Sequence, residues 1–360
     1  MKIQRRKTKT INLGSVKIGS GYPISVQSMT KTDTSNVKAT VAQIKRLQKA
    51  GCEIIRIAVK DRPSCDAISE IRRKIDIPLE ADIHFDYRLA LKAMECGVDA
   101  IRLNPGNIYK VEQVEEVVRL ACKKRIPIRV GVNSGSVRIP KGKVISKNKF
   151  PDLMVKAAAD YIRIMENLGF CDIMVSLKAS DVMGTIEAYR RMATACDYPF
   201  HLGVTAAGPL VKGTVKSSLG IGILLMEGIG DTLRVSLTGD SVDEVYVAKE
   251  ILQSLGLRNF GPEIISCPTC GRTEVDIIKI TSEVENSLNR IKDEKGRLSK
   301  LRVAIMGCVV NGPGEAKEAD FGIAAGKGGG LLFVKGKPIK KIKESEFTSA
   351  IISEIKRILN

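Results

Sequence analysis

The chain contains no tryptophan, and aromatic residues make up only 4% of its 360 residues. Proteins that bind single-stranded nucleic acid stack its bases on aromatic side chains. This scarcity argues against that class, although the net charge is +18. No run of 18 or more apolar residues is present, so we expect no membrane-spanning helix. The first ten residues are polar and basic, and we expect no signal peptide and a cytoplasmic location.

Histidine is also scarce, since His84 and His201 are the only two in the chain, and the nine cysteines are an odd number. We expect these cysteines to be thiols in a reducing compartment. Three stand out, because Cys267 and Cys270 form a Cys-x-x-Cys pair and Cys308 lies in the stretch Met-Gly-Cys-Val-Val-Asn-Gly-Pro-Gly-Glu-Ala. A structural zinc site usually takes four nitrogen or sulfur ligands, and neither histidine is near. Three thiolates can instead hold a cubane iron–sulfur cluster, with one iron left for a weaker ligand or a substrate.

From about residue 22 to residue 240, short apolar runs alternate with amphipathic helical patterns. The expected strands are Ile24–Ser28, Ile54–Val59, Leu79–His84, Ala100–Asn104, Ile128–Asn133, Ile173–Lys178, His201–Thr205 and Leu233–Leu237. Regular alternation of strand and helix indicates a parallel sheet, and eight such units in about 250 residues fit a TIM barrel. A doubly wound open sheet is the alternative, but no Gly-x-Gly-x-x-Gly follows the first strand.

The pattern changes near residues 257–262, Leu-Arg-Asn-Phe-Gly-Pro. Beyond this break the sequence predicts a small α+β domain that contains all three selected cysteines. Its expected elements are strands Glu263–Ser266, Leu301–Met306, Asp320–Ala324 and Leu331–Lys335, with helices Glu274–Lys292 and Glu344–Leu359. We therefore expect two domains, residues 1–258 and residues 259–360. The first would bind the substrate, and the second would hold the metal group.

Several of the expected barrel strands carry charge where a parallel sheet is normally apolar. The cationic residues are Arg56, Arg102, Arg129, Lys178 and Arg234. Buried arginines are costly unless they are paired or face a ligand, and we expect Asp82 and Glu53 to be too few to balance them. Scattered structural ion pairs are one explanation. A strongly anionic substrate such as a diphosphate at the mouth of the barrel is the other, because guanidinium groups bind phosphate oxygens in a bidentate manner.

Two further features of the barrel region are less specific. Glycines at 203, 208, 213 and 220, around Ser217 and Ser218, could supply backbone donors to a phosphate. A basic insert at residues 138–149 follows the fifth expected strand and is either a lid over the mouth or a solvated loop.

Six motifs together resemble the 4-hydroxy-3-methylbut-2-enyl diphosphate synthase family of the non-mevalonate isoprenoid pathway. They are Cys267-Pro-Thr-Cys-Gly-Arg, Met306-Gly-Cys-Val-Val-Asn-Gly-Pro-Gly-Glu-Ala, Val26-Gln-Ser-Met-Thr, Ala81-Asp-Ile-His-Phe, Leu103-Asn-Pro-Gly-Asn and Gly230-Asp-Thr-Leu-Arg-Val-Ser-Leu-Thr. The resemblance extends from about residue 3 to the C-terminus and is to the shorter, two-domain bacterial form.

The resemblance implies a TIM barrel followed by a smaller α+β, ferredoxin-like iron–sulfur domain. It implies a 4Fe-4S cluster held by Cys267, Cys270, Cys308 and the carboxylate of Glu315. The implied substrate is 2-C-methyl-D-erythritol 2,4-cyclodiphosphate, which a two-electron reduction opens and dehydroxylates. The implied partners are reduced flavodoxin or ferredoxin as electron donor, and a second copy of the chain in a homodimer with the active site across subunits.

Site roles follow from the resemblance and the strand pattern together. The substrate-binding candidates are Arg56, Arg102, Asn104, Arg129, Asn133, Lys178, Thr205, Arg234 and Ser236. The catalytic candidates are Glu315, as an exchangeable cluster ligand, and His84 with Asp82, as proton donor or hydroxyl anchor. The chain departs from the family pattern at Thr205-Ala206-Ala207-Gly208, where the family usually has Thr-Glu-Ala-Gly. The glutamate carboxylate expected at position 206 is therefore missing.

Two other classes of protein stay open on sequence alone. One is a different TIM-barrel enzyme that acts on a phosphorylated or pterin substrate and has a merely structural metal domain. The other is a basic nucleic-acid-binding module with a zinc-like site, whose binding would depend strongly on salt. The barrel pattern argues against the second class.

Overall fold

The computed structural model describes residues 3–138, 146–288, 290–291, 297–308, 312–315, 317 and 319–359. The chain divides into two compact units, residues 1–258 and residues 259–360. Part of the basic insert, residues 139–145, lies outside the described residues, and so do residues 309–311 and 316 of the Cys308 motif. No helix among the described residues is both long enough and apolar enough to span a bilayer.

The first unit is a nearly closed barrel of eight parallel strands. The strands are β3 (Ser25–Met29), β4 (Ile54–Val59), β5 (Leu79–Ile83), β6 (Ala100–Leu103), β7 (Ile128–Asn133), β8 (Ile173–Lys178), β9 (His201–Leu202) and β10 (Thr232–Leu233). They follow the order β8-β7-β6-β5-β4-β3-β10-β9, and a bridge between Val175 and Phe200 links β8 to the segment before β9. The predicted TIM barrel is therefore confirmed.

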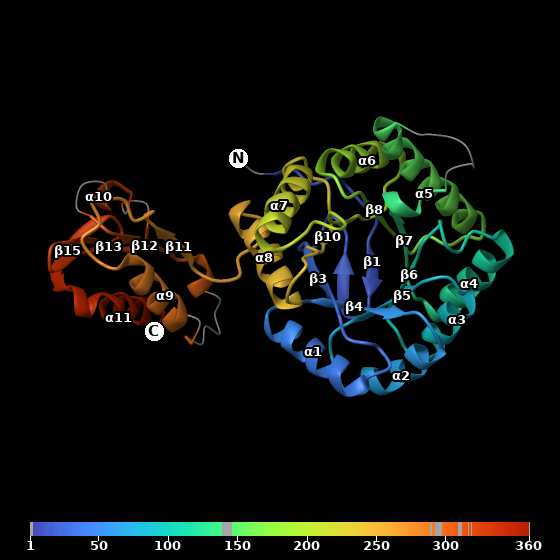
Figure 1. The fold of residues 1–360 in the computed structure, drawn as a ribbon, viewed down its shortest axis with the longest axis horizontal. Helices are drawn as coiled ribbons and strands as arrows, with labels where there is room; N and C mark the ends of the chain where they lie inside the picture. The colour runs from blue at the N-terminus through green and yellow to red at the C-terminus, as the bar shows by residue number, and fades with distance from the viewer. Residues whose placement is uncertain are drawn as a thin grey trace. The chain divides into compact units, whose positions relative to one another are not determined.

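Helices form a ring around the barrel (Figure 1). The helices are α1 (Val37–Lys49), α2 (Arg62–Arg72), α3 (Tyr87–Glu95), α4 (Val111–Lys124), α5 (Phe150–Asn167), α6 (Val182–Ala195), α7 (Leu210–Met226) and α8 (Ser241–Ser254). Most follow their strands after a short loop that ends in a capping side chain. Asp61, Asp86 and Asp181 each accept a hydrogen bond from the first turn of the next helix. Such caps fix where each loop leaves the mouth of the barrel.

The amino-terminal end of the barrel is covered by a hairpin that the sequence did not predict. It consists of β1 (Ile11–Leu13) and β2 (Val16–Ile18), paired antiparallel. Its apolar side chains pack against Ile54, Ala100 and Met174 at the base of the barrel. Because this end is closed by apolar packing, the carboxyl ends of the strands are the open side, where TIM-barrel enzymes bind their substrates.

The second unit is a five-stranded mixed sheet in the order β11-β12-β13-β14-β15. Its strands are β11 (Glu263–Ser266), β12 (Arg302–Met306), β13 (Phe321–Gly326), β14 (Gly329–Val334) and β15 (Lys337–Lys343). Strands β11 to β13 run parallel, and β14 and β15 follow as antiparallel hairpins. Helices α9 (Ile277–Leu288) and α11 (Phe347–Leu359) pack their buried side chains on this sheet. This agrees with the predicted α+β unit, to which the structure adds β15.

Candidate active site

The interior of the barrel is filled by polar and charged side chains instead of the usual branched apolar ones. In TIM barrels, side chains from alternate strands stack in layers, and here Gln27, Glu80 and Arg129 from β3, β5 and β7 contact one another. The carboxylate of Glu80 lies 2.8 Å from the Arg129 guanidinium, and both side chains are fully buried. Gln27 donates a hydrogen bond to Glu80 and accepts one from Arg129. These contacts fix the Arg129 guanidinium inside the barrel.

Asp82 on β5 organises two of the predicted arginines. Arg102 donates a 3.0 Å hydrogen bond to the Asp82 carboxylate, and the Arg56 guanidinium lies 3.8 Å from it. Arg102 also donates to the carbonyl of Gly131, and a Cβ at Gly131 would lie 2.3 Å from Arg102 Nε. Glycine is required at 131 because the arginine crosses the strand at this point.

The fourth arginine is paired from outside the strands. Arg234 lies 3.3 Å from the carboxylate of Glu244 on α8, which is buried and also accepts a hydrogen bond from Leu237 N. Glu53, which the sequence suggested as a balancing carboxylate, instead binds Arg258. The sequence analysis named only Asp82 and Glu53 as nearby acids and missed the carboxylates of Glu80 and Glu244.

Lys178, at the carboxyl end of β8, is the cation without a carboxylate partner among the described residues. Its side chain is only 6% exposed. Burial lowers the pKa of Lys178 well below its ordinary value, and the neighbouring charges of Arg56 and Arg129 lower it further. A Cβ at Gly203 would lie 2.8 Å from Lys178 Nζ, so Gly203 leaves room for the ammonium group.

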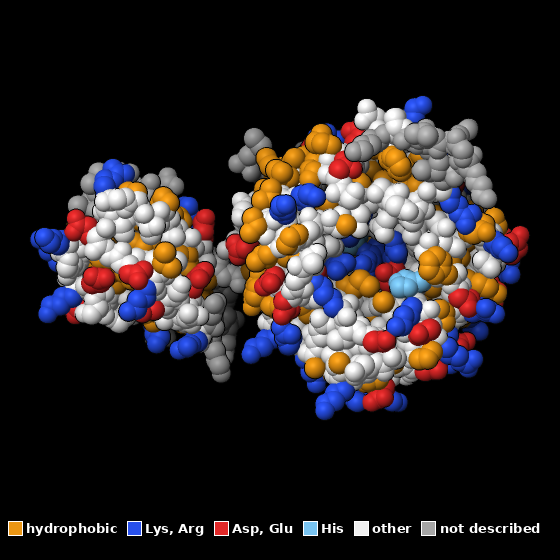
Figure 2. All heavy atoms as spheres, in the orientation of Figure 1, with side chains coloured by type: hydrophobic (Ala, Val, Ile, Leu, Met, Phe, Trp, Pro, Cys, Tyr) orange, Lys and Arg blue, Asp and Glu red, His pale blue; other side chains and the backbone are white. Residues whose placement is uncertain are grey.

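The cationic residues Arg56, Arg102, Arg129, Lys178 and Arg234 thus outnumber the carboxylates Glu80, Asp82 and Glu244 around them. Figure 2 shows lysine and arginine side chains on the floor of the hollow at the centre of the barrel. Excess positive charge in a poorly solvated chamber is costly by itself and attracts an anion. The ion pairs position the arginines, and the remaining charge favours a ligand with several phosphate oxygens.

The remaining site candidates lie around the mouth. His84, Asn104, Asn133, Thr205 and Ser236 all lie at or just beyond the carboxyl ends of β5, β6, β7, β9 and β10. Asn104 is buried and accepts hydrogen bonds from Gly106 N and from the Ser136 hydroxyl. Ala206 is exposed with φ = 50°, a left-handed conformation that is strained for alanine, and it offers no carboxylate.

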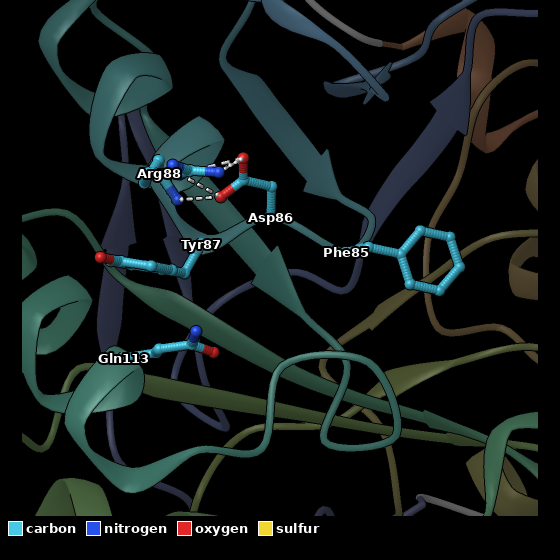
Figure 3. Close-up of a pocket in the computed structure, with 5 residues that line it drawn as sticks. All are labelled: Phe85, Asp86, Tyr87, Arg88 and Gln113. Carbon is cyan, nitrogen blue, oxygen red and sulfur yellow. Dashed lines mark hydrogen bonds and ion pairs between the residues drawn. The ribbon is translucent and has the colours of Figure 1, made fainter.

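The loop after β5 begins at His84 and leads to α3. Asp86 caps α3 and binds Arg88 through both carboxylate oxygens, so its charge is neutralised. These two residues line a shallow hollow with Phe85, Tyr87 and Gln113, and Phe85 points away from the others (Figure 3). The cation that lines this outer hollow, Arg88, is paired with Asp86.

His201 is a site residue that the sequence did not select. It is fully buried on β9, and neither of its ring nitrogens has a hydrogen-bond partner in the part of the chain that the structure describes. Burial lowers its pKa well below 6.5, and the charges of Lys178 and Arg129 act in the same direction. His201 is therefore a neutral imidazole beneath the cationic chamber. Its period-two spacing from Thr205, through Gly203, was the signal that could have identified it.

The depressed pKa predicts that His201 destabilises the fold at low pH. Above about pH 6.5 the residue is neutral in both the folded and the unfolded chain, so it does not change the free energy of unfolding with pH. As the pH falls below that value, the unfolded chain takes up a proton that the folded chain refuses, so His201 contributes a loss of at most about 1.4 kcal/mol per pH unit. Urea unfolding between pH 7.5 and 5 should show a shallower loss for His201→Gln than for the wild type. His84→Gln is the control, and identical profiles for His201→Gln and wild type would contradict a neutral, buried His201.

The three selected cysteines lie at one end of the second unit. Cys267 follows β11 and Cys308 follows β12, and these strands are neighbours in parallel register. Gly307 N donates a hydrogen bond to Cys267 Sγ at 3.2 Å, and a Cβ at Gly307 would lie 3.1 Å from the same sulfur. Hydrogen bonds from Arg272 lower the pKa of Cys270, and the charges of Cys270 and Cys308 raise the pKa of Arg272.

This donor set fits a cubane cluster. Within the described ranges, no three histidine, cysteine or carboxylate side chains converge closely enough for one metal ion, whereas a cluster of several atoms holds its thiolates further apart. Backbone and arginine donors to the sulfurs are the kind of contact that stabilises iron–sulfur clusters. Glu315 ends the short helix α10 (Gly312–Glu315), but its side chain lies outside the described residues.

A cationic chamber at the carboxyl ends of a TIM barrel, with a three-cysteine group in a second unit, defines a barrel oxidoreductase for an anionic substrate. Residues 8–249 match the GcpE TIM-barrel domain, and residues 263–357 match the GcpE protein C-terminal domain. The chain belongs to the GcpE family.

Relatives cover the whole chain. A protein of Thermodesulfovibrio yellowstonii named 4-hydroxy-3-methylbut-2-en-1-yl diphosphate synthase (flavodoxin) is 56% identical over 99% of this chain and 100% of the relative. A Clostridium perfringens protein of the same name is 52% identical over 99% of this chain and 100% of the relative. A dihydropteroate synthase of Coxiella burnetii, solved with pteroic acid, matches with a TM-score of 0.50 and 12% identity over 70% of this chain and 99% of its own. That likeness concerns the fold alone.

Proposed function

We propose that this chain opens 2-C-methyl-D-erythritol 2,4-cyclodiphosphate by reduction to 4-hydroxy-3-methylbut-2-enyl diphosphate, an isoprenoid precursor. The observation that carries this proposal is the excess of buried cations at the mouth of the barrel, with Lys178 lacking a carboxylate partner among the described residues. A diphosphate offers the several oxygens that this charge requires. The full-length relatives bear the name of this diphosphate product.

The cationic residues bind the diphosphate in this proposal, and the amides and hydroxyls orient the rest of the substrate. The ion pairs of Glu80, Asp82 and Glu244 hold three arginines in place before the ligand arrives. Preorganised guanidinium groups lose little conformational freedom on binding, which increases affinity. Lys178 supplies a further positive charge to the diphosphate. Asn104, Asn133, Thr205 and Ser236 face the carbon skeleton and its hydroxyls.

Asp82 and His84 have different roles in the proposal. Contacts with Arg102 and Arg56 hold the pKa of Asp82 at about 2 although burial alone would raise it. Asp82 therefore remains a carboxylate at neutral pH and acts by positioning the arginines. His84, which is half-buried at the end of β5, is the group that delivers a proton to the departing hydroxyl. The reaction breaks the carbon bond to this hydroxyl and the ring bond from carbon to a phosphate oxygen. Two electrons and one proton balance it, the hydroxyl leaves as water, and the phosphate oxygen becomes part of the linear diphosphate.

Cys267, Cys270 and Cys308, with Glu315 as fourth ligand, hold a 4Fe-4S cluster in this proposal. Such a cluster accepts and donates single electrons, so two successive transfers supply the reduction. The donor is reduced flavodoxin, which the relatives' names specify, or a ferredoxin in its place.

Turnover of the cyclic diphosphate by the anaerobically purified chain tests the proposal. Reduced flavodoxin should support stoichiometric formation of the linear diphosphate, and a chain without the cluster should form none. Binding of the cyclic diphosphate without turnover under these conditions would overturn the proposed reaction.

An apolar stripe on α7 supports the homodimer that the family resemblance implies. Val211, Val215 and Leu219 are four residues apart, share one face of the helix and are at least half exposed. Hydrophobic side chains gather over this region of the barrel (Figure 2). Exposed apolar patches of this kind mark association surfaces, and a second copy of the chain is the occupant that we propose.

Val215→Glu should convert the dimer to a monomer in light scattering after gel filtration, because it places a charge in the centre of the stripe. Ile278→Glu, at an exposed position on α9, is the control and should leave the dimer intact. A Val215→Glu dimer as stable as the wild type would exclude this face.

We also propose that each active site combines residues of two subunits. A mixture of the inactive variants Lys178→Met and Cys308→Ala should then recover about a quarter of wild-type activity, because half of the dimers are mixed and each has one intact site. No recovery in the mixture would show that each site belongs to one chain.

A further inference from the structure

The end of the chain contains a long segment without acidic residues. Between Phe321 and Lys343 there are six lysines and no aspartate or glutamate. The segment forms β13, β14 and β15, and β15 is one of the two edge strands of the sheet. Lysines on an edge strand also prevent strand-to-strand aggregation.

The strand register places part of this charge at the cysteine end of the sheet. Lys341 lies opposite Leu331, Leu331 lies opposite Ala324, and Ala324 lies opposite Met306. Neighbouring strands are about 4.8 Å apart, so this row spans about 14 Å from Met306 to Lys341. Met306 precedes Cys308 by two residues. Lys341 therefore lies at the same end of the sheet as the cysteines, although on a different strand.

Lys343 and Lys327 extend the charge further toward this end. Lys343 pairs with Gly329, two residues beyond the Lys341 row, and Lys327 lies in the turn between β13 and β14. Lys327, Lys341 and Lys343 are exposed and form no ion pair among the described residues. Glu346 is close, but its carboxylate accepts a hydrogen bond from Lys343 N at the start of the last helix. We call Lys327, Lys341 and Lys343 the lysine edge.

We propose that the lysine edge is the docking surface for the acidic face of the reduced carrier protein that delivers electrons to this unit. The proposal rests on the function proposed above. Opposite charge on the two surfaces accelerates encounter and sets the orientation of the complex. Docking at this edge brings the carrier's redox group to the end of the sheet that bears the cysteines. Lys335 and Lys337 lie at the opposite end of the hairpin, where β14 turns into β15, and do not take part.

A pair of charge reversals on the same strand tests the surface. The full-length holoprotein is titrated with a recombinant bacterial flavodoxin at several ionic strengths, and the dissociation constant is measured from flavin fluorescence. Lys341→Glu/Lys343→Glu should weaken binding by at least about tenfold at low salt and reduce its salt dependence. Lys335→Glu/Lys337→Glu has the same change of charge at the far end and should alter binding less than about threefold.

The rate with a small reductant separates this proposal from the function on which it rests. Turnover of the cyclic diphosphate with a reduced viologen dye should be the same in both double variants and in the wild type. Equal flavodoxin affinity in the two variants, with normal viologen-driven turnover, would overturn the docking surface alone. Absence of turnover in the wild type with either reductant would overturn the proposed function instead.

Discussion

Lys178→Met is expected to lower kcat/KM for the cyclic diphosphate by about two to three orders of magnitude, while the barrel becomes more stable. A charge-assisted hydrogen bond to a phosphate contributes about 1.5–3 kcal/mol, and loss of a desolvated charge from a binding site costs about 2–5 kcal/mol. Stability should rise because Lys178 is buried among Arg56 and Arg129 and has no carboxylate partner within the described residues. A residue kept at a cost to the fold indicates a functional role.

The depressed pKa of Lys178 gives this prediction a second measurement. Bound diphosphate favours the protonated ammonium, so inorganic pyrophosphate should raise the pKa of Lys178 toward its ordinary value. The pyrophosphate affinity, measured by calorimetry over a range of pH values, should therefore change less with pH in Lys178→Met than in the wild type. Lys45→Met, at an exposed position on α1, is the matched control. Unchanged pyrophosphate affinity in Lys178→Met would show that the cationic chamber does not bind the diphosphate.

Cys308→Ala is expected to abolish both the cluster and turnover. Two thiolates from Cys267 and Cys270 then remain, which is too few to retain a cubane. Cys122→Ala is the matched control, because Cys122 is exposed on α4 in the other unit and should have no effect on iron content or activity. Both variants should bind pyrophosphate as the wild type does, since the binding residues lie in the barrel unit. Turnover by Cys308→Ala without a cluster would contradict the proposed mechanism.

The barrel was predictable because each of its strands and helices has a local pattern of apolar residues in the sequence. Strands Ile54–Val59, Ile128–Asn133 and Ile173–Lys178 have the bounds that their apolar runs predict. The strand expected at His201–Thr205 is shorter and ends at Leu202. At Gly203 the Lys178 ammonium and the Arg234 carbonyl both approach the backbone closely, and no local pattern in the sequence reveals that crowding.

The ion pairs inside the barrel were harder to predict than its strands. Glu80 could have been found, because it is two residues from Asp82 and so faces the same side of β5. Glu244 could not, since it lies on α8 and its contact with Arg234 depends on the packing of that helix. Ion pairs of this kind are set by tertiary structure and not by the period of one element.

Two further departures have physical causes. β15 was missed because Lys337–Lys343 contains a proline and four lysines, which are tolerated only at a sheet edge.

The glycines at 213 and 220 are not phosphate donors as the sequence suggested. Both lie inside α7, where a Cβ would collide with Leu237 or Val204. They allow close packing of the helix on the barrel.

The most direct test of the account is the amount of iron and acid-labile sulfide per chain after anaerobic purification. The account predicts about four of each, as a cubane on Cys267, Cys270 and Cys308 requires. Zinc without sulfide would contradict it, because the second unit would then be structural and the cationic barrel would need a different reaction.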